Sequence, residues 1–247
     1  MEYYINNFNN FNKIIIYNFK IRHGGIGDFL KYFMIILTEC IKKNIRVYRK
    51  INNIEIEKYI KFKYDFFNIN SDKISKLKNV TIKEPGNYYG KEYKGNLCLN
   101  EVFYFDKSIK MNIQNILPKL PVNYISIHLR LGDKYLETKK KFIHCKNDVR
   151  TFSQKKIYKF IEENSDKIII FFCDNKKKKL KIKSKYKNVI ITNAEIGHTS
   201  YPSTKNKEVL DTITEFYILS NSQLIYAASH SGFSEMASKF NNNKYIK

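Results

Sequence analysis

The amino-acid sequence predicts an α/β fold built mainly on parallel sheets, and three observations support this prediction. Short apolar segments alternate with amphipathic ones in the second half of the chain, which is the pattern of strands joined by crossover helices. The chain also opens with a strand, a glycine-rich turn and a helix. Several apolar segments end abruptly in polar residues, as strands do at the ligand-binding edge of an open sheet.

The first half contains one clear α/β unit. Lys13 to Phe19 is a β-rich apolar segment, and apolar residues then recur at helical spacing from Leu30 to about Lys43. Beyond this helix we expect only short strands, at residues 45–51, 80–83 and 97–105.

The second half alternates more regularly. We expect strands at 124–128, 167–173, 189–192 and 223–226, and helices at 152–163, 207–220 and 231–240. The helix at 207–220 should face inward through Leu210, Ile213, Tyr217 and Leu219. Because Pro118 and Pro121 bracket a linker, we expect two domains, residues 1–120 and residues 121–247.

The formal net charge of +22 and the pI of about 9.6 do not by themselves indicate a nucleic-acid partner. The excess is almost all lysine, and it accompanies many Asn, Ile, Tyr and Phe residues with only 4 Pro and no Trp. A+T-rich codons encode these residues, so a skewed genome, such as that of a large DNA virus, explains the basicity. The lysine tracts at 139–141 and 176–179 are therefore expected to be solvated surface.

The four cysteines and the hydropathy pattern indicate a soluble protein of a reducing compartment. Cys40, Cys98, Cys145 and Cys173 lie far apart, which predicts neither a disulfide framework nor a zinc site. We find no cationic segment followed by an apolar h-region and no apolar run of about 18 residues, so we expect a cytoplasmic protein, in the host cytoplasm if the chain is viral. Nothing in the sequence indicates an oligomeric state.

The apolar segment 125–129 ends in His-x-Arg-x-Gly-Asp, and Arg130 within it is one of only five arginines. A guanidinium presents a planar fork of donors that matches two phosphate oxygens, whereas an ammonium is a point charge. Arg130 is therefore the first candidate for binding a phosphate. The alternative is that it pairs with Asp133 and braces the turn.

Two other strand ends and one glycine loop carry further candidates. Asp174 follows the strand at 167–173, and it either contacts a ligand or caps the next helix. The loop Ser229 to Ser234 opens a helix, so its hydroxyls and N–H groups either cap that helix or bind an anion. Gly24, Gly25 and Gly27 form either a simple tight turn or a ligand loop before the first helix.

Together these motifs resemble the peptide motifs of GDP-fucose-dependent fucosyltransferases. The similar features are His-x-Arg-x-Gly-Asp after a strand, an aromatic strand ending in Asp, and an Asp-led helix followed by a strand and Ser-Gly-Phe-Ser. The stretch from Gly24 to Tyr32 is similar to the Gly-Gly-Leu-Gly-Asn-Gln-x-x-x-Tyr motif of the α1,2 branch. The resemblance implies the GT-B architecture, two Rossmann-like domains facing a cleft, here with a reduced N-terminal domain.

The resemblance also implies roles for individual residues. Arg130 would contact the β-phosphate, His128 would shape the donor pocket, and Asp174 would contact the guanine or the ribose. Further donor contacts would come from Asp211, Ser231, Gly232, Phe233 and Ser234. The chain departs from the family at Leu131, where a second Arg is frequent, and at Asp28, where Asn is usual.

The resemblance implies transfer of a deoxyhexose, L-fucose from GDP-fucose, to a glycan or protein hydroxyl. Because the chain contains no Asp-x-Asp, we expect this transfer to be metal-independent and inverting, with no cofactor. Arg130 and helix N-termini would stabilise the departing diphosphate. Asp28, Asp133 and His23 are candidates for the base, and Asp28 is favoured by its place in the inter-domain loop. Two alternatives stay open: another sugar nucleotide, such as a rhamnosyl donor, and a non-enzymatic nucleic-acid-binding protein.

Overall fold

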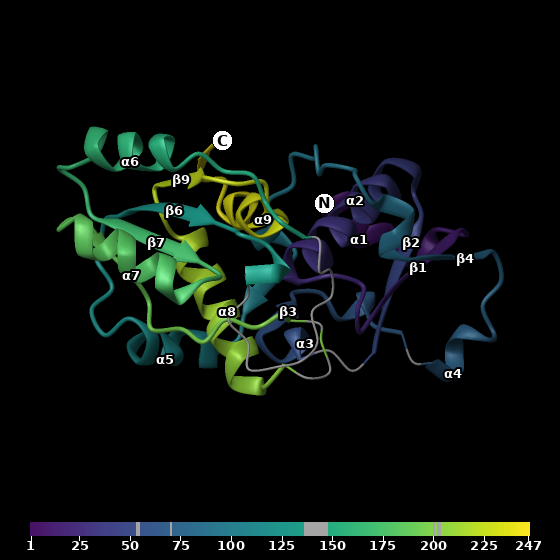
Figure 1. The fold of residues 1–247 in the computed structure, drawn as a ribbon. Helices are drawn as coiled ribbons and strands as arrows, with labels where there is room; N and C mark the ends of the chain where they lie inside the picture. Colours follow the sequence, from purple (N-terminus) through teal and green to yellow (C-terminus); the bar gives the residue numbers. More distant parts are fainter. Residues whose placement is uncertain (53–54, 70, 136–147, 200, 202–203) are drawn as a thin grey trace.

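The structure, a computed structural model, describes the 247 residues except 53–54, 70, 136–147, 200 and 202–203. Within this part of the chain there are a three-stranded sheet, a five-stranded sheet and a two-stranded ribbon (Figure 1). The two larger sheets are parallel throughout and the ribbon is antiparallel. The predicted α/β class with mainly parallel sheets is confirmed.

The first sheet has the order β2-β1-β4, with β1 (Ile14–Lys20) between β2 (Arg46–Asn52) and β4 (Val80–Lys83). Helix α2 (Ile26–Lys43) links β1 to β2, and it ends at Asn44, which adopts the left-handed conformation that terminates helices. The predicted strand at 97–105 is wrong in length, because η4 (Leu99–Glu101) replaces its middle and only β5 (Phe103–Phe105) is extended. Strand β5 pairs with β3 (Ile60–Phe62).

Short helices complete this half of the chain. They are α1 (Glu2–Asn7), η1 (Phe8–Asn10), α3 (Ile56–Tyr59), η2 (Asp65–Phe67), α4 (Ser71–Ile74), η3 (Pro85–Tyr88) and α5 (Lys107–Ile116).

The second sheet has the order β10-β9-β6-β7-β8. Its strands are β6 (Ile125–Leu129), β7 (Ile169–Cys173), β8 (Val189–Ile190), β9 (Leu224–Ala227) and β10 (Lys244–Ile246). Its helices are η5 (Asp133–Tyr135), α6 (Gln154–Glu163), α7 (Lys176–Lys185), α8 (Asn206–Ser220) and α9 (Gly232–Phe240). The predicted helices at 152–163, 207–220 and 231–240 correspond to α6, α8 and α9, whereas β10 was not predicted.

Helices cover both faces of the five-stranded sheet, because alternate strand residues point to opposite sides. Ile127 of β6 and Phe171 of β7 pack with α6 and α7 in one apolar cluster. Phe172 of β7 and Ile225 of β9 lie on the other face and pack with α8 and α9. The sheet is therefore doubly wound.

The larger apolar cluster continues from α8 and α9 into the first half of the chain. Helix α2 packs against α9, and α5 packs against α8 (Figure 1). One apolar cluster therefore joins the two sheets, in addition to the separate cluster under α6 and α7. In α8, Ile213 and Leu219 are buried as predicted. Leu210 and Tyr217 are only partly buried, because Val209 and Phe216 occupy the inward face.

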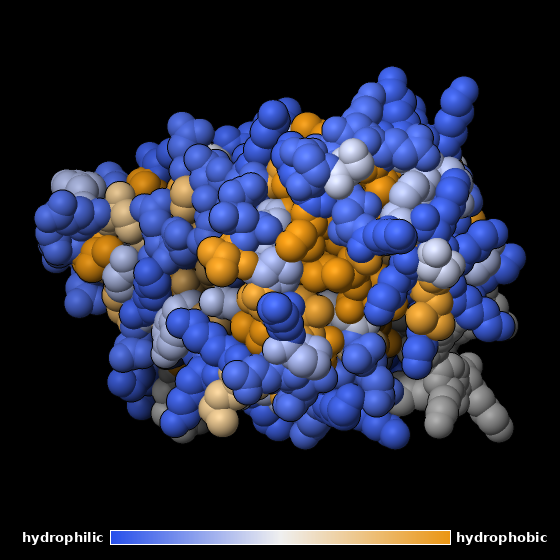
Figure 2. Space-filling view, turned by 90° about the vertical axis from the view of Figure 1, so that its left-hand side faces the viewer, coloured by the Kyte–Doolittle hydropathy of each residue, from blue (hydrophilic) through white to orange (hydrophobic). Residues whose placement is uncertain are grey.

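The face shown in Figure 2 is mostly hydrophilic around a central apolar area. In the described residues, no helix is both long and apolar enough to cross a membrane.

Candidate functional site

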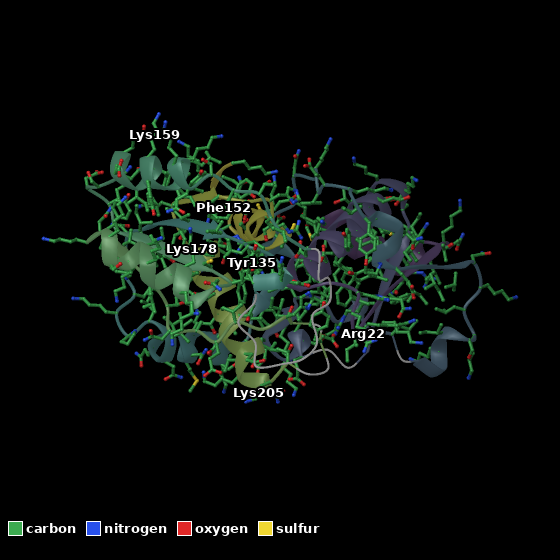
Figure 3. The ribbon with its side chains drawn as sticks, in the orientation of Figure 1. Arg22, Tyr135, Phe152, Lys159, Lys178 and Lys205 are labelled. Atoms are coloured by element: carbon green, nitrogen blue, oxygen red, sulfur yellow. The ribbon has the colours of Figure 1, made fainter. Side chains whose placement is uncertain are left out.

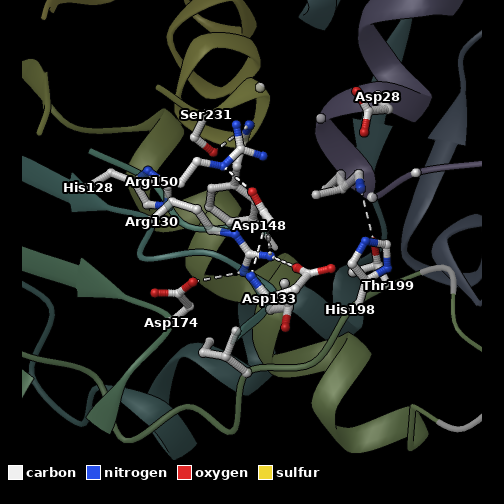
Figure 4. Close-up of a pocket in the computed structure, with 18 of the residues that line it drawn as sticks. Asp28, His128, Arg130, Asp133, Asp148, Arg150, Asp174, His198, Thr199 and Ser231 are labelled. Atoms are coloured by element: carbon white, nitrogen blue, oxygen red, sulfur yellow. Dashed lines mark hydrogen bonds and ion pairs between the residues drawn. The ribbon is translucent and has the colours of Figure 1, made fainter. Parts of the chain in front are cut away.

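A pocket of about 680 Å³ lies where the two halves of the chain meet. The loops after β1, β6 and β9 line it, together with residues 196–199 (Figure 4). In the strand order β10-β9-β6-β7-β8 the chain moves to one side from β6 to β7 and β8, and later to the other side for β9. The point between β6 and β9 is therefore the topological switch point at which open α/β sheets bind ligands.

Two helices begin at this pocket, α2 at Ile26 and α9 at Gly232. Gly27 lies so near α9 that a Cβ added to it would be 2.5 Å from the carbonyl carbon of Gly232. The backbone N–H of Ile26 donates to Thr199 Oγ1 at 2.9 Å. Helix N-termini carry unpaired N–H groups and a partial positive charge, so two favourable ends for an anion converge here.

Arg130 follows β6 and faces the pocket, with its side chain 20% exposed. Its Nη1 lies 3.0 Å from Asp174 Oδ2, and its Nη2 forms an ion pair with Asp133. Its backbone N–H donates to Ser229 Oγ, which in turn donates to the Arg130 carbonyl oxygen, both at 2.8 Å. Arg130 thus pairs with Asp133, as the structural alternative predicted, and also lines the pocket.

The backbone after Arg130 explains the glycine of the motif. Gly132 has φ +110°, and a Cβ there would lie 2.0 Å from the carbonyl oxygen of Asp148, so any side chain would collide. Asp174 accepts hydrogen bonds from the N–H groups of Leu131 at 2.9 Å and Gly132 at 3.1 Å.

Asp174 therefore has a structural task in addition to lining the pocket. Its two carboxylate oxygens hold the turn after β6 and the guanidinium of Arg130. The alternative that Asp174 caps the next helix is wrong, because Asn175 Oδ1 accepts the Lys178 N–H at 3.0 Å and caps α7.

His128, in β6, lines the pocket with a buried ring. The ring stacks on Phe233, with 5.1 Å between centroids and 18° between planes. Burial, and secondarily the charge of Arg130, lower the pKa of His128 to about 3. The imidazole is therefore neutral near pH 7, and its Nδ1 has no hydrogen-bond partner among the described residues.

Ser231, Gly232 and Phe233 line the pocket, as do Gly24, Gly25 and Gly27. Ser231 also caps α9, since its Oγ accepts the Phe233 N–H at 3.3 Å. Ser231 thus both caps α9 and lines the pocket.

Two predicted donor contacts lie outside the pocket. Ser234 is fully buried and its hydroxyl donates to the Ser231 carbonyl oxygen at 3.3 Å. Asp211 is buried and accepts from the N–H of Glu195 at 3.0 Å and from Asn112 Nδ2 at 2.9 Å. Asp211 therefore supports the segment that leads to Ile196 and does not itself face the pocket.

Asp28 lies in the first turn of α2, across the pocket from Arg130 (Figure 4). The ammonium of Lys31 is 3.6 Å from its Oδ1. Of the other candidate bases, Asp133 lines the pocket but is bound to Arg130. His23 is not among the residues that line the pocket, and its Nδ1 accepts the Lys20 N–H at 3.2 Å.

Arg150 and Asp148 were not predicted, although both line the pocket. Arg150 Nε lies 2.7 Å from Asp148 Oδ1, and the Arg150 N–H donates to the Leu131 carbonyl oxygen at 2.9 Å. The scarcity of arginine, which singled out Arg130, was a signal that applied equally to Arg150.

Lys179 corrects the prediction that 176–179 is solvated. It is 3% exposed, and its Nζ lies 2.9 Å from Glu215 Oε1 and 3.2 Å from Thr192 Oγ1. Glu215 lines the pocket, so a buried ion pair supports its wall. The tract at 139–141 and Cys145 lie outside the described residues, while Cys40, Cys98 and Cys173 are free thiols.

The strand order and the pocket at the switch point define a Rossmann-like α/β fold. Neither the models of known protein families nor the curated protein sequences match this chain. Among solved structures, the fold is similar to that of the NodZ α-1,6-fucosyltransferase co-crystallised with GDP, with a TM-score of 0.59 and 9% identity over 92% of this chain and 91% of that one.

Two further structures share the fold. A variant of Arabidopsis thaliana FUT1 in complex with GDP has a TM-score of 0.57 and 9% identity, over 94% of this chain and 69% of that one. POFUT1 in complex with GDP has a TM-score of 0.50 and 11% identity, over 94% and 95% respectively. These similarities show a common fold.

Proposed function

We propose that this protein is a glycosyltransferase that moves a deoxyhexose, L-fucose from GDP-fucose, to a hydroxyl of a glycan or protein. The observation that carries the proposal is that the Arg130 guanidinium and the N-termini of α2 and α9 meet in one pocket at the switch point of a doubly wound sheet. The fold shared with fucosyltransferases supports it.

In this proposal the architecture is GT-B, with residues 1–120 on the acceptor side and residues 121–247 binding the donor. The three-stranded sheet lies in the first range and the five-stranded sheet in the second. The pocket between the loops after β1 and the loops after β6 and β9 supports this assignment.

The reaction breaks the bond between the anomeric carbon and the diphosphate oxygen, so negative charge grows on the leaving group. Arg130, the Ser231 hydroxyl and the N–H group of Gly232 would stabilise that charge, and no metal ion is required. Neutral His128, stacked on Phe233, would shape the donor pocket.

Inversion requires the acceptor hydroxyl to attack from the side opposite the diphosphate. Asp28 lies across the pocket from Arg130, which suits a base that takes the hydroxyl proton as the new C–O bond forms.

Ligand binding followed by turnover tests the proposal. The purified protein should be stabilised by GDP and not by UDP or dTDP, by ~2.7 kcal/mol at about 100 times the dissociation constant. Mass spectrometry should then detect fucose released or transferred from GDP-fucose, with or without EDTA. Selective stabilisation by dTDP or UDP would assign the site to another sugar nucleotide, and the absence of stabilisation by any of the three would refute the proposal.

A further inference from the structure

A second pocket of about 400 Å³ adjoins the first, and Arg150 lines both. It is lined by residues of three segments, namely Leu131 and Tyr135 after β6, then Val149, Arg150 and Phe152, and finally Asn175 with three lysines of α7. Figure 3 shows Tyr135, Phe152 and Lys178 together on this part of the surface, with Lys159 some way off. We refer to it as the lysine pocket.

The lining of the lysine pocket is positively charged, and of its cations Arg150 is paired with Asp148, which lines the larger pocket. The lining of the lysine pocket includes four cations and, among the described residues, no carboxylate; the cations are Arg150, Lys177, Lys178 and Lys181. Five carboxylates line the larger pocket instead. The three lysines of the smaller pocket therefore suit a ligand with an exposed negative charge.

Two aromatic rings lie open in the same pocket. Tyr135 is 42% exposed and Phe152 is 38% exposed. The Tyr135 N–H donates to the Gly132 carbonyl oxygen at 2.9 Å, and Asn175 Nδ2 donates to the Tyr135 carbonyl oxygen at 3.2 Å. The Lys178 ammonium lies 5.0 Å from the Phe152 ring centroid. The Tyr135 backbone is thus anchored, and one face of the Phe152 ring lies against the Lys178 ammonium.

We propose that the lysine pocket binds an anionic sugar of the acceptor, a pyranose that carries a phosphate or carboxylate. The apolar C–H faces of a pyranose stack on the electron-rich faces of aromatic rings, and the lysines pair with the anionic group. The volume suits a small ligand, since such pockets measure about 300–1,000 Å³.

Because Arg150 belongs to both pockets, a sugar held here lies next to the donor site. The reacting hydroxyl would still enter from the side of residues 1–120, and the lysine pocket would bind a second, anionic unit of the same acceptor. This inference rests on the proposed function, which supplies the donor and the hydroxyl transfer.

The test uses the full chain and glucose 6-phosphate as the probe, with glucose and inorganic phosphate as comparison ligands, in saturation-transfer NMR titrations. Glucose 6-phosphate should bind more tightly than either. The triple variant K177A/K178A/K181A should bind it about tenfold more weakly. The matched control K159A/K183A/K187A removes the same charge from exposed lysines outside the pocket and should stay within about twofold of wild type.

Phe152→Ala separates recognition of the ring from recognition of the charge. It should weaken binding of glucose 6-phosphate and leave binding of inorganic phosphate unchanged. Equal affinity of the wild type for both ligands, or equal losses in the two triple variants, would overturn the inference. So would displacement of the probe by a short single-stranded oligonucleotide at lower concentration, which would assign the pocket to nucleic acid.

GDP titrations of the same variants distinguish this inference from the proposed function. GDP affinity should be unchanged in K177A/K178A/K181A. A loss of GDP affinity there would place the lysine pocket in the donor site and overturn the acceptor assignment. If the wild type binds GDP but not glucose 6-phosphate, only this inference is refuted. If the wild type does not bind GDP, the proposed function is refuted.

Discussion

Gly27 and Gly232 join the N-terminus of α2 to the N-terminus of α9 by direct backbone contact. A Cβ on Gly27 would lie 2.7 Å from both the Gly232 carbonyl oxygen and the Phe233 nitrogen, so no side chain fits. This contact brings the glycine loop after β1 to the edge of the second sheet, and it builds the pocket from two distant segments of the chain.

Gly27→Ala should therefore destabilise the protein, although alanine is the better helix former. Because the colliding atoms are backbone atoms, we expect a loss of about 1–3 kcal/mol in the free energy of unfolding, as for an overpacked core. Urea denaturation measures it. Gly86→Ala is the control, since a Cβ there meets nothing within 4 Å; equal stabilities of the two variants would contradict the contact.

Arg130→Lys should lower the turnover number by about 10²–10³, because an ammonium keeps the charge but loses the forked donors. Lysine is preferred to alanine, since removal of the charge would leave Asp133 and Asp174 buried without a cation. Initial rates with GDP-fucose measure the effect, and the far-UV circular dichroism should match the wild type. Unchanged turnover would remove Arg130 from the mechanism.

Asp28→Asn should reduce the turnover number by about 10²–10⁴ and leave GDP affinity unchanged, because a base acts on the acceptor hydroxyl and not on the diphosphate. A variant that keeps the wild-type rate would point to Asp133 as the base.

His128 should make the protein less stable in mild acid. Its folded pKa of about 3 lies below the unfolded value of about 6.5, so below pH 6.5 the unfolded chain binds a proton that the folded chain excludes. Stability should fall as the pH decreases from about 6.5 toward 3, by up to ~1.4 kcal/mol per pH unit.

Urea denaturation at pH 7 and pH 5 tests this dependence. His128→Asn should show a smaller difference between the two pH values than the wild type. His230→Asn changes an exposed histidine and should keep the wild-type difference. Identical pH dependence in His128→Asn and the wild type would show that His128 is not protected from protonation.

Lys179→Met should cost about 3–5 kcal/mol of unfolding free energy, because it leaves the carboxylate of Glu215 buried without a cation. The double variant K179M/E215L should recover most of the loss, since an apolar pair of similar volume tolerates burial. Lys183→Met, at an exposed position of the same helix, should change stability by no more than about 0.5 kcal/mol. Chemical denaturation of the four proteins provides the comparison, and a small effect of Lys179→Met alone would show that the pair is solvated.

The sequence predicted the features that depend on local patterns. The alternation of apolar and amphipathic segments identified β6, β7, β9, α6, α8 and α9, and His-x-Arg-x-Gly-Asp located the end of the central strand. Most of the predicted site residues line the pocket, because strand ends and helix starts meet at one edge in a parallel sheet.

What the sequence did not predict depends on contacts between distant residues. The lysine tract gave no sign that Lys179 would be buried, because its partner Glu215 is 36 residues away on α8. The motif predicted that Asp211 contacts the donor. In the structure its carboxylate instead accepts hydrogen bonds from the Asn112 side chain and the Glu195 backbone N–H, outside the pocket. Residues 97–105 are β-prone, yet hydrogen bonds of η4 such as Glu101 N–H to the Cys98 carbonyl oxygen prevail there.

The apolar cluster that joins α2, α8 and α9 should make the two halves of the chain unfold together. A fragment that starts at residue 121 would expose to water the faces of α8 and α9 that pack on α5 and α2. Such a fragment should aggregate or unfold at a low temperature. Heating the intact chain should produce a single calorimetric transition. Any ligand bound between the halves should raise the temperature of that single transition. The melting temperature of the whole protein would therefore report whether the pocket is occupied.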